Sequence, residues 1–184
     1  MERVAGVAVN TSLLQSPLSD NDRRDLVALL QACVEGGASI GFIAPLGVVD
    51  AEAYWQRVEA ELPAEYRLLF GARDEAGRIV GTVQLVAETR RNGRHRAEIQ
   101  KLLVSPAHRG HGLGSQLMAQ AETTARARSL TLLFLDTSEG PGGARRFYEQ
   151  LGYRYAGGIP GYALDPDGTL RANAIFYKTL AADG

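Results

Sequence analysis

The spacing of apolar residues changes near residue 66, and this change restricts the possible folds more than any other feature of the sequence. Three segments beyond it alternate apolar and polar residues with a period of two, which is typical of strands: 66–73, 78–88 and 96–105. The short polar stretches 74–77 and 91–93 between them are hairpin signals. The sequence therefore predicts an antiparallel meander of three strands.

The residues before the meander are typical of helices instead. Apolar residues recur there three or four positions apart, with capping and stop residues at the expected places. The predicted elements are a strand over 3–9 followed by a polar turn, a helix from Ser19 or Asp20 to the Gly36–Gly37 pair, an apolar loop over 39–49, and a helix capped by Asp50 and stopped by Pro63.

After the meander, helices and strands alternate. The predicted order is a helix over Gly112–Arg128, an apolar strand over Leu130–Leu135, a helix over Pro141–Leu151, and strands over Tyr153–Tyr155 and Ala174–Thr179. A wholly apolar strand between two helices favours a buried parallel pair. The expected fold class is α/β, with a mixed, mostly antiparallel sheet that contains one parallel pair and is flanked by helices.

Composition narrows the class of protein. The chain has 184 residues, a size at which we expect one domain over 1–184. A net charge of −1 provides no general field for nucleic acid or anionic lipid, and no apolar run is long enough to span a membrane. The single cysteine, Cys33, lies in an apolar helical pattern and fits a reducing cytoplasm, and the N-terminus lacks the pattern of a signal peptide. The three histidines lack metal-ligand spacing, so we expect no metal, and the sequence leaves a homodimer open.

The segment Arg109-Gly110-His111-Gly112-Leu113-Gly114 leads from a strand into a helix. Glycines there allow tight turns, and unpaired N–H groups at a helix start attract anions. A simple tight turn is the alternative. A Walker loop requires Lys after its last glycine, and the dinucleotide motif places its third glycine one residue later, so neither fits. The sequence therefore predicts a local cradle for a phosphate or pyrophosphate.

This segment resembles the hallmark of the GNAT N-acetyltransferase superfamily, Arg/Gln-x-x-Gly-x-Gly/Ala. A second hallmark follows downstream as Phe147-Tyr148-Glu149-Gln150-Leu151-Gly152-Tyr153. The resemblance implies the GNAT fold, with acetyl-CoA as co-substrate. It also implies the cofactor-binding residues, in the strand and in the turn: Leu102, Leu103, Val104, Arg109, Gly110, His111, Gly112, Leu113, Gly114 and Ser115.

Acetylation of an amine requires a neutral nucleophile. An alkylammonium of pKa about 10 costs roughly 4 kcal/mol to deprotonate at pH 7, so a positioned base is expected. Glu98, in the middle of a strand, is the first candidate, and an exposed glutamate on an outer face is the alternative. Asp136 follows the apolar strand and is the second candidate, as a base or to orient a water, with a helix cap as the alternative. The resemblance implies that Tyr148 donates a proton to the leaving sulfur; its alternative role is packing.

Within the superfamily, segments such as Glu98–Leu102 and Leu135–Thr137 look like the tabtoxin-resistance type, which acetylates a β-lactam dipeptide toxin. The leading hypothesis is therefore acetyl-CoA-dependent acetylation of a small amine, such as an amino-acid-like toxin or antibiotic. The alternatives are acetylation of a protein N-terminus or lysine, and a non-catalytic acyl-CoA sensor. Tyr54, Trp55 and the 39–49 loop are expected to cover the acceptor pocket, with a core role open for Trp55, and the loop 157–162 is expected to close the other side.

Overall fold

A computed structural model of the chain describes residues 10–38, 40–138, 144–165 and 167–180. Its helices are α1 (Asp20–Glu35), α2 (Val48–Glu61), α3 (Leu113–Ala127) and α4 (Ala144–Gln150), with short 3-10 helices η1 (Leu62–Ala64) and η2 (Pro106–His108). Its strands are β1 (Asn10–Leu14), β2 (Arg67–Arg73), β3 (Ile79–Ala87), β4 (Arg96–Val104), β5 (Leu132–Ser138), β6 (Arg154–Gly157), β7 (Ala163–Leu164), β8 (Leu170–Arg171) and β9 (Asn173–Thr179).

Seven of these strands form one sheet in the order β1-β2-β3-β4-β5-β9-β6, and β7 pairs with β8 in a small hairpin. The seven strands are joined by six strand pairs. Five of these pairs are antiparallel, and the pair β4–β5 is parallel. The expected mixed α/β sheet with one parallel pair and flanking helices is confirmed.

Two apolar clusters lie on opposite faces of the sheet. In β2, Phe70 faces the cluster formed with α3 and α4, whereas Leu69 faces the cluster formed with α1 and α2. This division follows from the alternation of side chains along a strand. All five residues predicted for the inner side of α3 are buried: Leu113, Leu117, Met118, Ala121 and Ala125.

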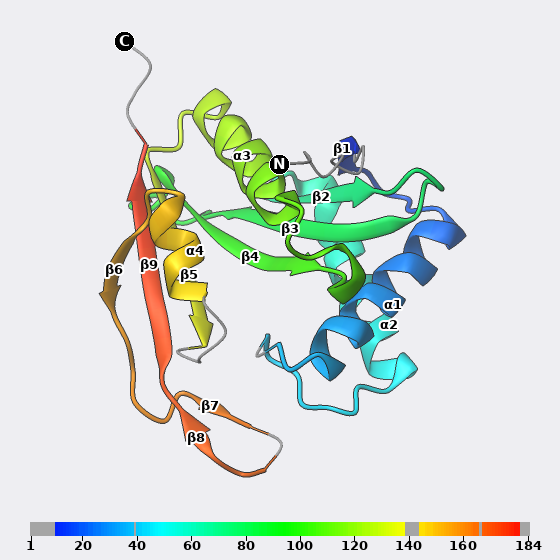
Figure 1. Cartoon of the computed structure of the whole chain (residues 1–184). Helices are drawn as coiled ribbons and strands as arrows, with labels where there is room; N and C mark the ends of the chain where they lie inside the picture. Colours follow the sequence, from blue (N-terminus) through cyan, green and yellow to red (C-terminus); the bar gives the residue numbers. More distant parts are fainter. Residues whose placement is uncertain (1–9, 39, 139–143, 166, 181–184) are drawn as a thin grey trace, which may run out of the picture.

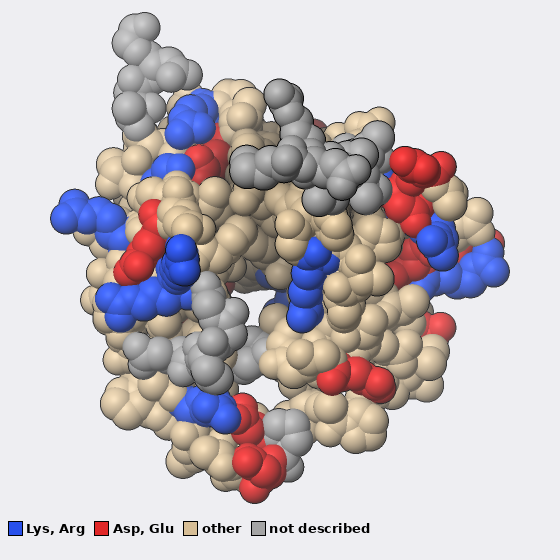
Figure 2. Space-filling view, viewed as in Figure 1, with Lys and Arg blue, Asp and Glu red and all other residues tan. Residues whose placement is uncertain are grey.

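The parallel pair β4–β5 separates after a short contact. Its ladder joins Arg96–Glu98 to Leu132–Phe134, and beyond these residues the two strands diverge (Figure 1). The molecule consequently has one half that contains β1–β4 and another that contains β5, β9 and β6. In the space-filling view the surface is hollowed between the two halves (Figure 2). The divergence of these strands positions the candidate site.

Several predicted boundaries are wrong. Residues 10–14, predicted as a turn, form β1, because Leu14 packs against Gly71 across the β1–β2 ladder. The strand predicted over 3–9 lies outside the described residues. The helix cap is Gly47, and Asp50 lies in the first turn of α2, where an acidic residue also suits the helix dipole. The apolar strand runs over 132–138, three residues further than predicted.

Candidate functional site

A cavity of about 220 Å³ lies where β4 and β5 separate. It is lined by Ile40, Glu98, Ile99, Gln100, Lys101, Leu102, Asp136, Thr137 and Tyr148. The three predicted catalytic residues thus come from β4, β5 and α4 and meet at one cavity. The exposed outer face considered for Glu98 is excluded, because its side chain is partly buried at this cavity.

A polar chain holds Glu98 in place. The Gln100 Nε2 donates a hydrogen bond of 2.9 Å to the Glu98 carboxylate, and the Gln100 Oε1 accepts one of 3.0 Å from Arg67. The Arg67 guanidinium also hydrogen-bonds Gln84 and forms an ion pair of 2.6 Å with Glu61. These contacts fix the rotamer of Gln100 and, through it, the direction of the Glu98 carboxylate.

The other two predicted catalytic residues differ in exposure. Asp136 is exposed on β5, beyond the end of the β4–β5 ladder. Tyr148 is 9% exposed on α4 and packs against Phe147, Tyr153 and Phe176. Burial and the negative charge of Asp136 raise the pKa of Tyr148 to about 12. Tyr148 therefore carries its proton at neutral pH, as the resemblance requires of a proton donor, and it also has the packing role named as its alternative.

Lys101 is the residue of this site that the sequence reasoning missed. It has a positive φ of 47° within β4. The β3–β4 register shifts there, because Thr82 pairs with Leu103 while Gln84 pairs with Gln100. Strict alternation would turn Lys101 away from Glu98, but with this bulge both side chains line the same cavity. The composition could have drawn attention to Lys101, since only two of the twenty basic residues are lysines.

A second cavity, of about 420 Å³, adjoins the first and shares four lining residues with it: Ile40, Lys101, Asp136 and Thr137. Its other lining residues come from two loops and from β5, β7 and β9: Gly41, Phe42, Ile43, Ser138, Tyr162, Ala163, Leu164 and Asn173. The predicted loop 39–49 and the loop 157–162 thus both contribute to its walls. The apolar side chains and hydroxyl groups could hold a small organic molecule beside Asp136.

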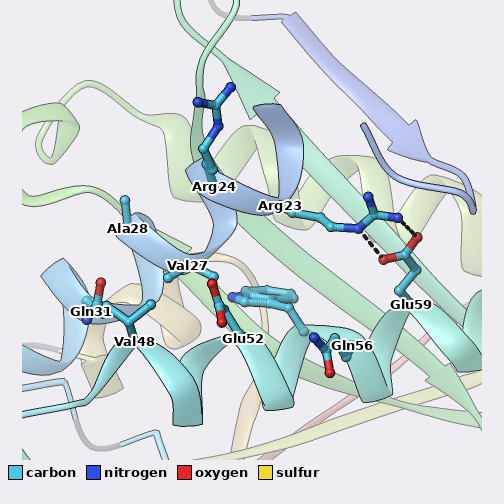
Figure 3. Close-up of a pocket in the computed structure, with 10 residues that line it drawn as sticks. Arg23, Arg24, Val27, Ala28, Gln31, Val48, Glu52, Gln56 and Glu59 are labelled. Atoms are coloured by element: carbon cyan, nitrogen blue, oxygen red, sulfur yellow. Dashed lines mark hydrogen bonds and ion pairs between the residues drawn. The ribbon is translucent and has the colours of Figure 1, made fainter. Parts of the chain in front are cut away.

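Tyr54 and Trp55 have separate roles. Tyr54 lines neither cavity, so it does not cover the acceptor pocket as expected. Its hydroxyl accepts a hydrogen bond of 2.9 Å from Gln84, and the Lys101 ammonium lies 5.6 Å from the centre of its ring. Trp55 is 2% exposed and donates a hydrogen bond of 2.9 Å to the Leu26 carbonyl, which is the core role left open for it. It borders a different cavity of about 370 Å³ between α1 and α2, crossed at one end by the Arg23–Glu59 ion pair (Figure 3).

The glycine-rich turn has the backbone that the sequence predicts. Gly110 and Gly112 have φ of 80° and 77°, values that strain residues with a side chain. A Cβ on either glycine would meet nothing within 4 Å, so open space surrounds the turn. Helix α3 begins after Gly112 without a side-chain cap, which leaves its first N–H groups available to an anion. These features fit a bound pyrophosphate.

The remaining cofactor-binding predictions fall on both sides of β4. Leu102 lines the smaller cavity, whereas Leu103 and Leu113 are buried in the core, so only their backbone could contact a cofactor. The Val104 carbonyl accepts hydrogen bonds from Arg109 Nε (3.3 Å) and from the Cys33 thiol (3.5 Å). Arg109 is exposed beside the turn, as are His111 and Gly112, and Gly114 and Ser115 are partly buried in the first turn of α3.

Residues 22–153, more than half of the chain, match the model of the acetyltransferase (GNAT) family. The chain belongs to this family. The family assignment made from the two motifs is therefore confirmed, and the GNAT acetyltransferase fold accounts for the seven-stranded sheet. Members of the GNAT family use acetyl-CoA as the acetyl donor.

Two curated GNAT relatives are similar to part of this chain. A glucosamine 6-phosphate N-acetyltransferase of Trypanosoma brucei brucei is 36% identical over 80 residues, which are 42% of this chain and 52% of the relative. An aminoalkylphosphonate N-acetyltransferase of Salmonella typhimurium is 46% identical over 57 residues, 31% of this chain and 37% of the relative. The chain thus matches about half of the first relative and just over a third of the second.

Solved structures share the fold at low identity. An acetyltransferase of Acinetobacter baylyi ADP1 has a TM-score of 0.79 at 15% identity, with 95% of this chain and 94% of that chain covered. A protein named as a phosphinothricin N-acetyltransferase has a TM-score of 0.78 at 20% identity, with 95% and 99% covered. An acetyltransferase of Salmonella typhimurium, solved with its cofactor acetyl-CoA, has a TM-score of 0.74 at 16% identity, with 95% and 96% covered.

Two other observations concern the part of the chain that the structure describes. Within it, no group of three or more His, Cys, Asp or Glu side chains is arranged to hold a metal ion. Among the same residues, each helix is too short or too polar to cross a membrane.

Proposed function

We propose that this chain is an acetyl-CoA-dependent N-acetyltransferase of one domain that acetylates a small amine. The observation that carries the proposal is that Glu98, Asp136 and Tyr148 line one cavity. The start of α3 lies next to that cavity, because a Cβ on Gly114 would meet the Phe147 ring of α4 at 3.3 Å. We infer that the anion cradle opens toward the cleft that holds the three reactive side chains.

The residues of the turn would hold the co-substrate, which supplies an acetyl group activated as a thioester. The N–H groups of the first turn of α3 and the Arg109 guanidinium would bind the pyrophosphate, and the backbone of Leu102 and Val104 would align the pantetheine arm. Open space at Gly110 and Gly112 allows a ligand to approach the backbone closely.

Three side chains of the cleft would carry the proton transfers. Glu98, held by Gln100, or Asp136 accepts a proton from the ammonium of the acceptor, directly or through a water. Tyr148 faces the same cavity and donates a hydrogen bond to the sulfur that leaves. The neutral amine attacks the acetyl carbon, the bond from that carbon to sulfur breaks, and CoA leaves as a thiolate. The nitrogen then loses its second proton to solvent, and the thiolate takes up a proton from solvent.

The acceptor class is the finer part of the proposal. The larger cavity, about 420 Å³, is of the size that holds small ligands. The curated relatives are named for acetylation of an aminoalkylphosphonate and of glucosamine 6-phosphate, and one structural neighbour is named for phosphinothricin. Together with the resemblance to the tabtoxin-resistance type, these names support an amino-acid-like toxin or antibiotic as the acceptor.

Two measurements test this function. Isothermal titration with acetyl-CoA should show binding at roughly tens of micromolar or tighter. A thiol-release assay over a panel of small amines, amino acids, aminophosphonates and peptides should then show turnover of the small acceptors. Binding without turnover of any amine or peptide would favour a non-catalytic sensor, turnover of peptides alone would favour protein acetylation, and no binding would contradict all three.

A further inference from the structure

Lys101 has an ammonium with no anionic partner in the described part of the structure. Its Nζ forms neither a hydrogen bond nor an ion pair with a described residue, and it makes a cation–π contact with the Tyr54 ring, whose centre is 5.6 Å away. Lys178, the other lysine of the chain, is fully engaged: its Nζ lies 2.7 Å from the Glu122 carboxylate and 2.7 Å from the Leu151 carbonyl. The two lysines therefore differ in what remains for a ligand to bind.

The surroundings of Lys101 make this lack of a partner costly. Its side chain is partly buried at the two cavities. The pKa of Lys101 is lowered, chiefly by burial and also by the charge of Arg67, and the charges of Asp136 and Glu98 oppose this shift only in part. Neither carboxylate comes within ion-pair distance of the ammonium. An anion that entered the cleft would supply the missing partner and offset the desolvation of the ammonium.

We propose that Lys101 binds the acidic group of a zwitterionic acceptor, a small molecule that carries an amine and, a few atoms away, a carboxylate, phosphonate or phosphate. Lys101 lies on the β4 wall of the larger cavity and Asp136 on the β5 wall. An acceptor with opposite charges at its two ends would place its amine beside Asp136 and its acidic group beside Lys101. This inference rests on the proposed function and selects among the amines that it allows.

The bulge in β4 supports the same role. The positive φ of Lys101 strains a residue that has a side chain, and such strain is found at functional sites. Without the bulge, Lys101 would lie on the opposite face of the strand from Glu98. With it, a cation and a proton acceptor from neighbouring positions of one strand face the same ligand.

The test compares acceptors that differ only in the acidic group. Wild type and Lys101→Met are assayed with an α-amino acid and its carboxamide, and with 2-aminoethylphosphonate and its diethyl ester. For each acceptor the ratio of kcat/KM between the two enzymes is taken, which cancels the amine's own pKa. We expect the ratio to exceed about 10 for the acidic acceptors, through KM, and to stay below about 2 for the neutral ones. Comparison of the ratios for the amino acid and for 2-aminoethylphosphonate shows whether Lys101 prefers a carboxylate or a phosphonate.

Three controls make the outcome decisive. Lys101→Arg should recover most of the affinity for acidic acceptors, and Arg154→Met, which removes an exposed cation from β6, should change no ratio. Titration with acetyl-CoA should give the same affinity for Lys101→Met as for wild type, which shows that the variant is folded. Equal ratios for acidic and neutral acceptors would overturn the role of Lys101 while leaving the proposed function intact. No turnover of any amine by the wild type would overturn both.

Discussion

Burial determines the chemistry open to Tyr148. Its pKa, raised to about 12, keeps the phenol protonated throughout the usual assay range. Complete transfer of that proton to a thiolate of ordinary pKa, about 8.5, would be uphill by roughly 5 kcal/mol. A hydrogen bond from the phenol to the departing sulfur avoids this cost and still stabilises the developing charge. Tyr148 is therefore better suited to stabilising the leaving group than to titrating with it.

Replacing Tyr148 by Phe should separate catalysis from binding. We expect kcat to fall by roughly 100-fold, because one hydrogen bond to a developing anion is lost. The dissociation constant of acetyl-CoA should change less than about 2-fold, since the ring and its packing remain. Steady-state kinetics and titration calorimetry measure the two quantities. In the wild type, Tyr148 should cause no loss of activity with rising pH below about pH 11, because the phenol stays protonated there. An unchanged kcat in the variant would remove Tyr148 from the mechanism.

A residue of the site could be predicted from the sequence where it belongs to a regularly alternating strand or to a known motif. Glu98 follows from its place in a strand, and Tyr148 from its place in the second motif. Lys101 was not predictable, because a bulge moves it to the other face and a bulge leaves no clear mark in one sequence. Asp136 was predictable as the end of an apolar strand, although that strand continues through it to Ser138.

At the scale of elements, the turn before α3 depends on the backbone freedom of glycine. Gly112 precedes the helix with a φ of 77°, and its Cβ position is empty. Only glycine takes this conformation at little cost. The conformation of the turn therefore depends on glycine at position 112. A larger side chain would meet no neighbouring atom there, but its residue would be strained at this φ.

Gly112→Ala should weaken cofactor binding through the backbone alone. We expect a stability loss of about 1–2 kcal/mol from the positive φ, and a weaker affinity for acetyl-CoA of at least about 5-fold as the N–H groups of the turn shift. Gly77→Ala is a matched control: this glycine has a φ of 79°, also has nothing within 4 Å of its Cβ position, and lies in the β2–β3 hairpin. Thermal unfolding should show a similar loss for both variants. If calorimetry found the same affinity in both, the turn would have no part in cofactor binding.

Elements stabilised by local pattern were predictable, and elements stabilised by distant contacts were not. Helix α1 begins at Asp20 after the Ser19 cap, as predicted, because the cap hydrogen bond is local. The residues of β1 were predicted as a turn. They form a strand because they pair with β2, more than fifty residues away, and a local pattern does not report such a pairing. The two-residue strands β7 and β8 carry too few residues to show a period at all.

At the scale of the whole molecule, ion pairs join α1 to α2 and α1 to the sheet. Glu59 of α2 accepts two hydrogen bonds from Arg23 of α1, at 2.9 and 2.8 Å, and one from the Leu18 backbone at 2.8 Å. Asp22 of α1 pairs with Arg73 of β2 at 2.7 Å. The hydrogen bonds from Arg23 and Arg73 lower the pKa values of Glu59 and Asp22 respectively. Both carboxylates therefore contribute stability while ionised.

The sign of the pH dependence follows from these lowered pKa values. The contribution of Glu59 is complete above its unfolded pKa, near 4.5, and is lost as the pH falls through its lower folded pKa. We expect Glu59→Gln to lower Tm at pH 7 by roughly 3 °C, equivalent to about 1 kcal/mol, and this difference to shrink as the pH approaches about 3. Scanning calorimetry from pH 7 to 3 measures it. Glu52→Gln, an exposed site on the same helix, is the control and should have little effect. A constant difference at all pH values would contradict the assignment.

The overall architecture was predictable because the order of helices and strands matches the superfamily along nearly the whole chain. For the walls of the larger cavity, the sequence predicted which loops contribute but not which of their residues meet. Phe42, Asp136 and Asn173 come together from three distant parts of the chain, and their spacing across the cavity depends on how far β4 and β5 diverge. That divergence is a property of packing on both sheet faces, which no local pattern reports.

The divergence of β4 and β5 also bears on solubility. Their ladder ends after three residue pairs, so two strand edges face each other inside a groove rather than on the outer rim of the sheet. Open edges ordinarily invite pairing with the sheets of other molecules and lead to aggregation. An edge that faces another strand across a groove is less accessible to the sheet of a second molecule than an edge on the outer rim. The opening in which we propose that the co-substrate binds thus keeps these two edges away from the outer rim of the sheet.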